Sequence, residues 1–360
     1  MTGLCTDKSN SIEVKTSMTL NKLIEDGFFD AKDILNIQVN ISTVERIILK
    51  NEYFRTIPNI NETIAALLTE HKLTTTCNLS CNDINWICAT SSSVMLEQPI
   101  YLKLKMPLII VGDIVGQYTD LIRIFRQYGF PGVANYLFLG NYIGVGPDGV
   151  DTLLLLLTFK ILYPENIFLL RGNHETNNPL FSTSFKEECT RKKCPYSSFV
   201  SVFDSMPIAA VVCEKIFCVH SGISSSIKDL SIDNRPEPIP SSGTIFDLLR
   251  SDTSTDISHY AIDQRDRTTL FGIKALQEFM ESNNFELVVR GHQCSSEGFS
   301  FPFGKQTFVS LYSASGAFGN NNGAVMIIGE EMEYSFFTHS PLTKEENDKF
   351  FQYDYTSDIL

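Results

Sequence analysis

Apolar runs that end abruptly at glycine, asparagine or histidine constrain the fold of this chain more than any other feature. Each run is apolar at nearly every position, which is typical of strands buried on both faces of a sheet that helices cover. The runs are residues 107–111 before Asp113, 136–139 before Asn141, 167–170 before Asn173 and His174, and 215–219 before His220. Helical patterns separate them, and four further strand patterns follow residue 285. We therefore predict an α/β fold in which a β-sandwich of mixed sheets is flanked by helices.

The chain divides into three segments by its local composition. Residues 1–80 are rich in Asn, Thr, Ile and Lys, and we expect a partly helical N-terminal extension with helices near 19–26 and 61–72. Residues 81–340 carry the regular strand and helix patterns and are predicted to form the main domain. Residues 341–360 are polar and acidic, which predicts a flexible C-terminal tail.

Composition argues against several classes of function. The net charge of −13 and pI near 5.0 are the opposite of what a nucleic-acid-binding surface requires. No apolar run, including the leucine run 153–157, approaches the ~20 residues that span a bilayer, and the N-terminus has no secretory pattern. Nine cysteines at irregular spacings indicate reduced thiols. We expect a soluble protein of the cytoplasm, the nucleus or both, with no membrane partner.

The polar residues at the strand ends are candidates for a metal centre. Asp113, Asn141, Asn173, His220 and His292 offer carboxylate, amide and imidazole groups, which suit borderline-hard divalent metals. Each residue alone is more often structural, but five such clusters after buried strands seldom coincide by chance. In open α/β folds the carboxyl ends of strands are where ligands bind, so we predict a site there.

Six longer motifs surround these residues. They are VGDIVGQYTDLIRIF (111–125), NYLFLGNYIGVG (135–146), YPENIFLLRGNHE (163–175), MPIAAVVCEKIFCVHSG (206–222), LLRSD (248–252) and VVRGHQ (288–293). In this order they resemble the PPP family of serine/threonine protein phosphatases, and within it the type 1 catalytic subunit. The resemblance covers about residues 82–338 and implies a metallophosphoesterase-type β-sandwich of mixed sheets flanked by helices.

The resemblance also implies a reaction. In the family, two metals bridged by an aspartate activate a water, two arginines hold the phosphate, and a histidine paired with an aspartate protonates the leaving group. Carried onto this chain, His174 is the acid, Arg265 and Arg290 are the phosphate ligands, and Asp252 is a supporting carboxylate.

Four positions depart from the family pattern. Val115 replaces a metal-binding histidine in GDxHG. In GDxVDRG, Asn141 replaces the bridging aspartate, Gly144 the aspartate that pairs with the acid histidine, and Val145 a phosphate-binding arginine. Without its carboxylate partner, His174 is expected to lose its fixed tautomer, a change that is costly in other enzymes.

These losses fall unevenly on the two metals. The first site keeps Asp113 as its one strong ligand, so we expect no metal there. The second keeps four neutral donors, namely Asn141, Asn173, His220 and His292. We therefore expect at most one divalent ion (manganese, iron or zinc), or none, with direct hydrogen bonding among these groups as the alternative.

Two functions remain open at this point. The first is an inactive or strongly impaired pseudophosphatase that binds regulatory proteins through an apolar groove, with phosphoproteins as a further class of partner. The second is an active or weakly active metal-dependent phosphoserine/phosphothreonine phosphatase, which the retained GNHE motif, Arg265 and Asp252 favour. The resemblance places the groove at Ile216, Leu287, Phe301, Met332 and Phe336, although ordinary core packing also explains these apolar residues.

Overall fold

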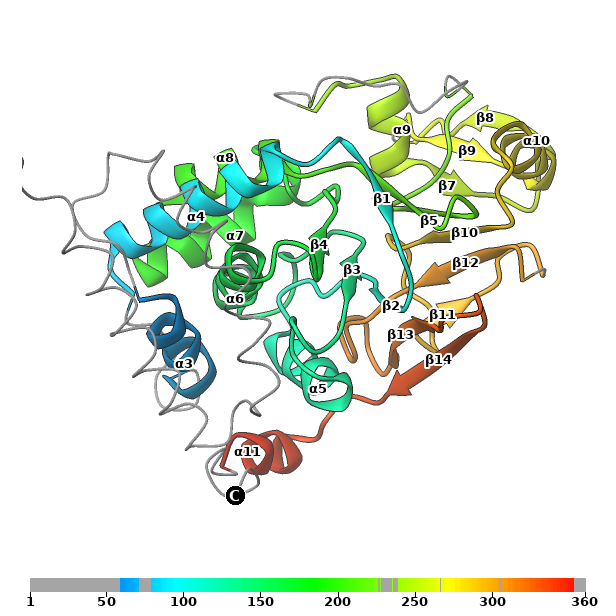
Figure 1. The fold of residues 1–360 in the computed structure, drawn as a ribbon. Helices are drawn as coiled ribbons and strands as arrows, with labels where there is room; N and C mark the ends of the chain where they lie inside the picture. Colours follow the sequence, from blue (N-terminus) through cyan, green and yellow to red (C-terminus); the bar gives the residue numbers. More distant parts are fainter. Residues whose placement is uncertain are drawn as a thin grey trace, which may run out of the picture.

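Two mixed β-sheets pack face to face between layers of helices in the computed structural model (Figure 1). The structure describes residues 59–70, 79–225, 227, 235, 239–265, 267–304 and 306–352. The helix predicted near residues 19–26 lies outside this part of the chain.

The five-stranded sheet contains three of the predicted apolar strands. Its order is β14-β13-β2-β3-β4, with β2, β3 and β4 parallel to one another and β13 antiparallel to both its neighbours. The strands are β2 (Leu108–Val111), β3 (Tyr136–Phe138), β4 (Ile167–Leu169), β13 (Gly323–Ile328) and β14 (Tyr334–His339). Because β2, β3 and β4 are parallel, the loops after them leave the sheet at one edge.

The six-stranded sheet contains the fourth run. Its order is β1-β5-β6-β10-β12-β11, and β6, β10 and β12 are parallel. The strands are β1 (Tyr101–Leu104), β5 (Ala209–Val212), β6 (Ile216–Val219), β10 (Leu287–Arg290), β11 (Phe299–Ser300) and β12 (Phe308–Leu311). A small sheet lies beside it, made of β7 (Asp252–Thr253), β8 (Tyr260–Ile262) and β9 (Thr269–Phe271).

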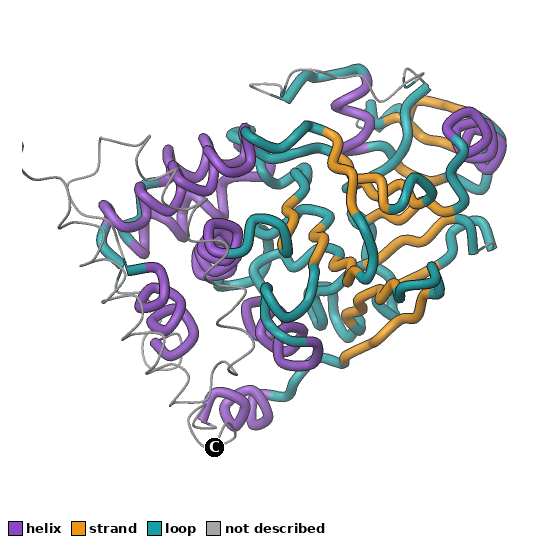
Figure 2. The backbone as a smooth tube through the Cα atoms, in the orientation of Figure 1, coloured by secondary structure: helices purple, strands orange, loops and turns teal. Residues whose placement is uncertain are grey.

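Helices cover both outer faces of the sandwich, most of them on the side of the five-stranded sheet (Figure 2). On that side lie α3 (Ile60–Glu70), α4 (Cys81–Leu96), α5 (Tyr118–Tyr128), α6 (Gly149–Leu162), α7 (Pro179–Lys192) and α8 (Tyr196–Ser205). Beyond the six-stranded sheet lie α9 (Thr244–Arg250) and α10 (Ile273–Asn283). The last described helix is α11 (Lys344–Gln352).

The apolar strands are buried on both faces, as their composition predicts. Ile109 and Val111 of β2 face the helices, whereas Leu108 and Ile110 face the other sheet. The same alternation divides β6 between the inter-sheet core and the core under α9 and α10. The prediction of a mixed-sheet sandwich flanked by helices is therefore confirmed.

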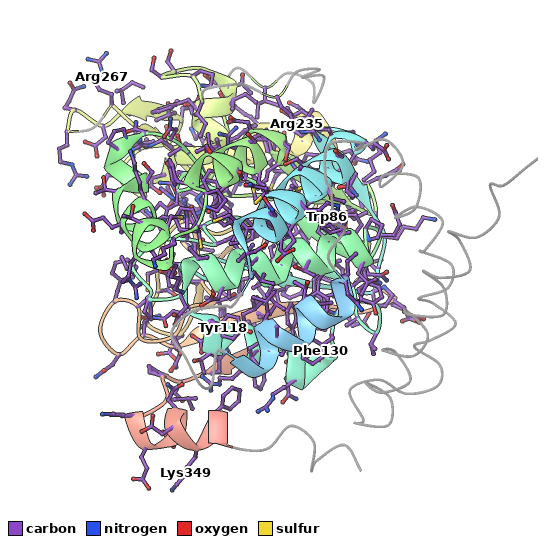
Figure 3. The ribbon with its side chains drawn as sticks, turned by 90° about the vertical axis from the view of Figure 1, so that its left-hand side faces the viewer. Trp86, Tyr118, Phe130, Arg235, Arg267 and Lys349 are labelled. Atoms are coloured by element: carbon purple, nitrogen blue, oxygen red, sulfur yellow. The ribbon has the colours of Figure 1, made fainter. Side chains whose placement is uncertain are left out.

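Both predicted end segments contain helices that join the main body. In α3, Leu67 is buried in the core under the helices. Its carbonyl oxygen accepts a hydrogen bond of 2.8 Å from the hydroxyl of Tyr118, which is labelled in Figure 3. In α11, Phe350 lies under the Arg126 guanidinium, 4.4 Å from ring centroid to Cζ. Residues 344–352 are therefore helical where a flexible tail was expected, and the three-segment division stays a prediction.

No helix in the part of the chain that the structure describes is long and apolar enough to cross a membrane. The most apolar helix, α6, is instead buried along its whole length between α4, α5 and the five-stranded sheet. Its one cation, Lys160, is fully buried and donates hydrogen bonds of 2.8 Å to the carbonyl oxygens of Pro164 and Ile167. Burial lowers the pKa of this ammonium from 10.5 to about 7.

We predict that Lys160→Met removes a pH-dependent part of the stability. Between pH 7 and 10 the unfolded chain holds the Lys160 proton and the folded chain has released it, so the free energy of unfolding rises with pH through this group. The wild type should gain up to ~1.4 kcal/mol per pH unit relative to Lys160→Met across this window. Urea unfolding at several pH values measures the difference. Parallel pH profiles for the two proteins would contradict the assigned pKa.

Candidate active site

The candidate residues lie in loops that leave both sheets at the same edge. Asp113 follows β2, Asn141 follows β3, and His174 follows β4, all in the five-stranded sheet. His220 and His292 follow β6 and β10 of the other sheet. The backbone N–H of His292 donates to Asp113 Oδ1 at 2.8 Å and so joins the two sets of loops.

The Asn141 side chain forms the centre of this cluster. Its Oδ1 accepts a hydrogen bond of 3.0 Å from the backbone N–H of His174, which fixes the orientation of the amide. Its Nδ2 therefore points inward and donates to Asp113 Oδ2 at 2.8 Å and to Asn173 Oδ1 at 3.0 Å. In this geometry the amide nitrogen of Asn141, which has no lone pair to give, faces Asp113 and Asn173, while its oxygen faces the His174 backbone, and the role of Asn141 as a metal ligand stays a prediction.

His220 and His292 keep donor atoms that fit one cation. His220 Nδ1 lies 2.9 Å from Leu139 O and its Nε2 lies 2.8 Å from Asn173 Oδ1, so a ring with one proton faces two acceptors. Burial lowers the pKa of His220 well below its ordinary value, which disfavours a second proton. His292 Nδ1 is buried and has no hydrogen-bond partner among the described residues.

Three atoms of this cluster can offer a lone pair to a cation: Asn173 Oδ1 and His220 Nε2, which lie 2.8 Å apart, and His292 Nδ1 on the neighbouring ring. The two rings lie edge to face with centroids 5.2 Å apart. This donor set suits a single borderline metal. Within the described residues, however, no group of three or more His, Cys, Asp or Glu side chains could hold a metal ion.

Val115, which the resemblance assigns to the first metal site, is surrounded by apolar atoms. It is 2% exposed and packs with Tyr312 and Ala314. Its φ of +42° lies in the left-handed region, which is unfavourable for a β-branched residue. Hydrogen bonds from Val115 N to Asn141 O (2.8 Å) and from Gly146 N to Val115 O (2.7 Å) hold the backbone there.

A backbone carbonyl orients the imidazole ring of His174. Its Nδ1 lies 2.8 Å from Ile143 O, so Nδ1 carries the proton and Nε2 is the acceptor. The expectation that His174 loses its fixed tautomer is therefore wrong. Burial lowers its pKa, the Ile143 carbonyl opposes that change, and the charge of Arg250 adds to it. A Cβ on Gly144 would lie 3.0 Å from His174 Nδ1, so Gly144 adjoins this ring.

The two arginines implied as phosphate ligands are not placed for that role. Arg290 is 0% exposed, and its guanidinium bonds to Asp252 Oδ1 (3.0 Å), Thr253 Oγ1 (3.3 Å) and Gln293 Oε1. Asp252 thus neutralises Arg290, and it also lies 3.8 Å from His292 Nε2. The Arg265 side chain is 89% exposed and pairs with Asp263 at 2.6 Å.

Two important residues were missed in the sequence, although both lie in quoted motifs. Glu175, the last residue of GNHE, is fully buried and accepts backbone N–H bonds from Asn141 (2.7 Å), Tyr142 (3.0 Å) and Gly172 (2.9 Å). Arg250, in LLRSD, is half-buried, and its charge contributes to the lowered pKa of both His174 and His292.

The residues of the implied partner groove lie together. Ile216 and Leu287 are paired across β6 and β10 and are buried. Phe301, Met332 and Phe336 are half-buried and pack against the same inter-sheet core. Phe336 stacks on Phe299 with ring centroids 4.1 Å apart, and it belongs to β14, the edge strand of the five-stranded sheet.

Comparison with known proteins places this cluster in a family. A family model described as calcineurin-like phosphoesterase matches residues 106–296, more than half of the chain. The protein therefore belongs to the calcineurin-like phosphoesterases, a family of metallophosphoesterases that generally use divalent metals.

One of the matching solved structures shares this fold. A Saccharomyces cerevisiae serine/threonine phosphatase, described as similar to human phosphatase PP5, superposes with a TM-score of 0.66 at 23% identity. The match covers 74% of this chain and 91% of the yeast chain, and it shows a shared fold. A cold-active protein-tyrosine phosphatase from a psychrophilic Shewanella species matches at 12% identity and TM-score 0.48, over 68% of this chain and 83% of its own.

The strained backbone at Val115 gives a prediction about stability. At an ordinary position a protein with glycine is less stable than one with alanine. At a positive φ, however, alanine is strained and glycine is not. We expect Val115→Gly to be more stable than Val115→Ala by about 1 kcal/mol in urea unfolding. At the neighbouring buried Ile114, which lacks a positive φ, the order should be reversed. If the alanine variant is the more stable one at both positions, Val115 is not strained.

Proposed function

We propose that this protein is a phosphatase homologue of the PPP type whose hydrolytic activity is lost or strongly reduced, and that it acts by binding other proteins. One observation carries the proposal most directly: Asn141 Nδ2 lies between Asp113 Oδ2 and Asn173 Oδ1. In the PPP resemblance this position belongs to the carboxylate that bridges two metals. An N–H donor there satisfies the oxygens that would otherwise face cations.

A single ion remains compatible with the neighbouring donors. Asn173, His220 and His292 would hold it, through Asn173 Oδ1, one ring nitrogen of His220 and the unpartnered Nδ1 of His292. When bound, a divalent ion would lower the pKa of a bound water and offset phosphate charge. Val115 supplies no donor for a second ion, and Asn141 supplies no bridging charge. Two ions about 4 Å apart repel strongly without an anion between them.

The retained acid geometry favours a second candidate function. His174 keeps a defined tautomer through Ile143 O, so its Nε2 can exchange a proton at a leaving oxygen. A slow, single-metal phosphoserine/phosphothreonine phosphatase is therefore the alternative to complete inactivity. The lost arginine at Val145 alone removes a charge donor of the kind worth ~10²–10³ in rate.

Metal content and turnover separate these functions from a working two-metal enzyme. We predict at most one transition metal per chain by elemental analysis, and very slow turnover of a chromogenic aryl phosphate with added manganese. Two metals per chain would defeat this account of Val115 and Asn141. Turnover at rates ordinary for the family would establish the phosphatase instead.

Restoring single ligands should not restore the enzyme. Val115→His adds one first-site ligand, but it leaves Asn141, Gly144 and Val145 as they are. We expect less than a hundredfold gain in aryl-phosphate turnover from Val115→His. The quadruple variant, which combines Val115→His with Asn141→Asp, Gly144→Asp and Val145→Arg, should show the larger gain and bind a second metal. A large gain from Val115→His alone would mean that the other three losses matter little.

Partner binding is proposed to use the apolar groove beside β14. Among the described residues β13 is the one strand paired with β14, so the outer edge of β14 offers backbone hydrogen-bonding groups to an extended segment. Phe301, Met332 and Phe336 would receive its apolar side chains. Regulatory proteins are the expected partners, with phosphoproteins as a second class. The excess of acidic residues argues against nucleic acid, and a cytoplasmic or nuclear location stays a prediction.

A pair of substitutions on β14 tests the groove. Phe336→Glu places a charge among the rings of Phe299 and Phe301, whereas Ser335→Glu adds the same charge at an exposed neighbour. We expect Phe336→Glu to weaken binding of a short peptide of alternating apolar residues roughly tenfold or more, by loss of one buried aromatic contact. Ser335→Glu should bind as the wild type does. Equal affinities in all three proteins would exclude this groove as the docking site.

A further inference from the structure

Two cysteines from distant parts of the chain meet on the helical side of the sandwich. Cys81 is the first residue of α4, which packs along α8, and Cys194 lies in the turn between α7 and α8 (Figure 1). The Cys81 thiol donates a hydrogen bond of 3.3 Å to the carbonyl oxygen of Lys193, 112 residues further along the chain and directly before Cys194. This contact brings the two cysteines close together, and both are free thiols.

Covalent geometry limits the distance between these two cysteines. A carbonyl oxygen lies about 2.8 Å from the next Cα across a trans peptide, so Cys81 Sγ lies within about 6 Å of Cys194 Cα. The two Cα atoms are then at most about 9 Å apart, whereas a disulfide usually holds them about 4.4–6.8 Å apart. Side-chain rotation and a shift of no more than about 2 Å at the start of α4 would bring them into that range.

Both thiols are carried by backbone that is already fixed. The Lys192 ammonium pairs with Asp151 at 2.7 Å and with Glu188 at 2.9 Å, and these contacts hold the turn after α7 against α6 and α7. On the other side, the Ser198 hydroxyl of α8 donates to Asn85 Oδ1 of α4 at 2.7 Å. A bond between the two thiols would therefore require little further ordering of the chain.

The two thiols differ in their access to solvent. Cys81 is exposed, whereas Cys194 is half-buried and packs against the core under the helices. Burial raises the pKa of the Cys194 thiol to about 11, so this thiol stays protonated at neutral pH. A dissolved oxidant therefore reaches Cys81 first, and Cys194 is placed to complete the reaction.

We propose that Cys81 and Cys194 form a reversible disulfide in the presence of a small-molecule disulfide such as oxidised glutathione. The Cys81 thiolate attacks one glutathione sulfur, a mixed disulfide forms, and the other glutathione leaves as its thiolate. The Cys194 thiol then gives its proton to solvent, and its sulfur attacks the Cys81 sulfur and displaces the second glutathione. The protein loses two electrons and two protons, and one glutathione disulfide is reduced to two thiols. This modification site is independent of the proposed function, because it uses neither the metal nor the phosphate residues.

The test oxidises the reduced full chain with glutathione disulfide under native conditions and maps its disulfides by mass spectrometry without reduction. We expect a peptide pair that joins Cys81 to Cys194 and that dithiothreitol separates. Cys194→Ser should stop at a glutathione adduct on Cys81, and Cys81→Ser should leave Cys194 unlinked. Cys294→Ser, which removes an exposed thiol after His292, is the control and should form the link as the wild type does.

Urea unfolding gives a second measurement that peptide mapping does not. A disulfide that closes this long loop restricts the unfolded chain, so the oxidised wild type should unfold at a higher urea concentration than the reduced protein. In Cys81→Ser the two midpoints should be equal.

Three results would overturn the proposal. The first is oxidised wild type without a link between Cys81 and Cys194. The second is a link from Cys81 to Cys77, or from Cys194 to Cys189, in its place. The third is a link between Cys81 and Cys194 that fails to raise the urea midpoint, because the folded structure would then not accommodate it. Metal content and aryl-phosphate turnover judge the proposed loss of catalysis separately from these measurements.

Discussion

The carboxylate of Glu175 is the interaction on which the geometry of the site depends. It is fully buried, and it accepts N–H bonds from Asn141 and Tyr142 after β3 and from Gly172 after β4. Burial raises its pKa to about 7, and the N–H donors oppose that rise by favouring the anion. Gly172 is required for this approach, because a Cβ there would lie 2.3 Å from Asn141 N. One acidic side chain thereby sets the backbone of two loops that carry Asn141, Asn173 and His174.

In the PPP resemblance an aspartate is expected at position 141, and this arrangement accommodates an asparagine there. The scaffold positions residue 141 through backbone contacts to Glu175, so the side chain there can change from carboxylate to amide without moving the loop. The amide then exchanges hydrogen bonds with Asp113, Asn173 and the backbone of His174. A buried polar group that is fully hydrogen-bonded costs little, whereas an aspartate there would add a second buried charge beside Asp113.

Much of the fold could be predicted from residue patterns, whereas the roles of the charged side chains could not. Strands such as β2 and β6 are apolar throughout and end at polar residues, so both their existence and the shared edge follow from composition. Arg290 lies at a strand end like the others, but its burial against Asp252 depends on β7, a two-residue strand without a sequence pattern. The Ile143 carbonyl that orients His174 is a backbone group, and its position cannot be predicted from the residue type.

The remaining balance at the site is between hydrogen bonds and one ion. A neutral His220 has one proton for two acceptors, Leu139 O and Asn173 Oδ1, so the metal-free network contains one poor contact. A cation between His220, Asn173 and His292 would remove that contact and would also satisfy the buried Nδ1 of His292. It would have to compete with Asn141 Nδ2 for Asn173 Oδ1, and it would find Asp113 as the nearby anion of the cluster. Because amide and imidazole ligands are neutral, they offset less of the dehydration cost of a divalent ion than a set of carboxylates would. The proposed single ion would therefore bind weakly and reversibly.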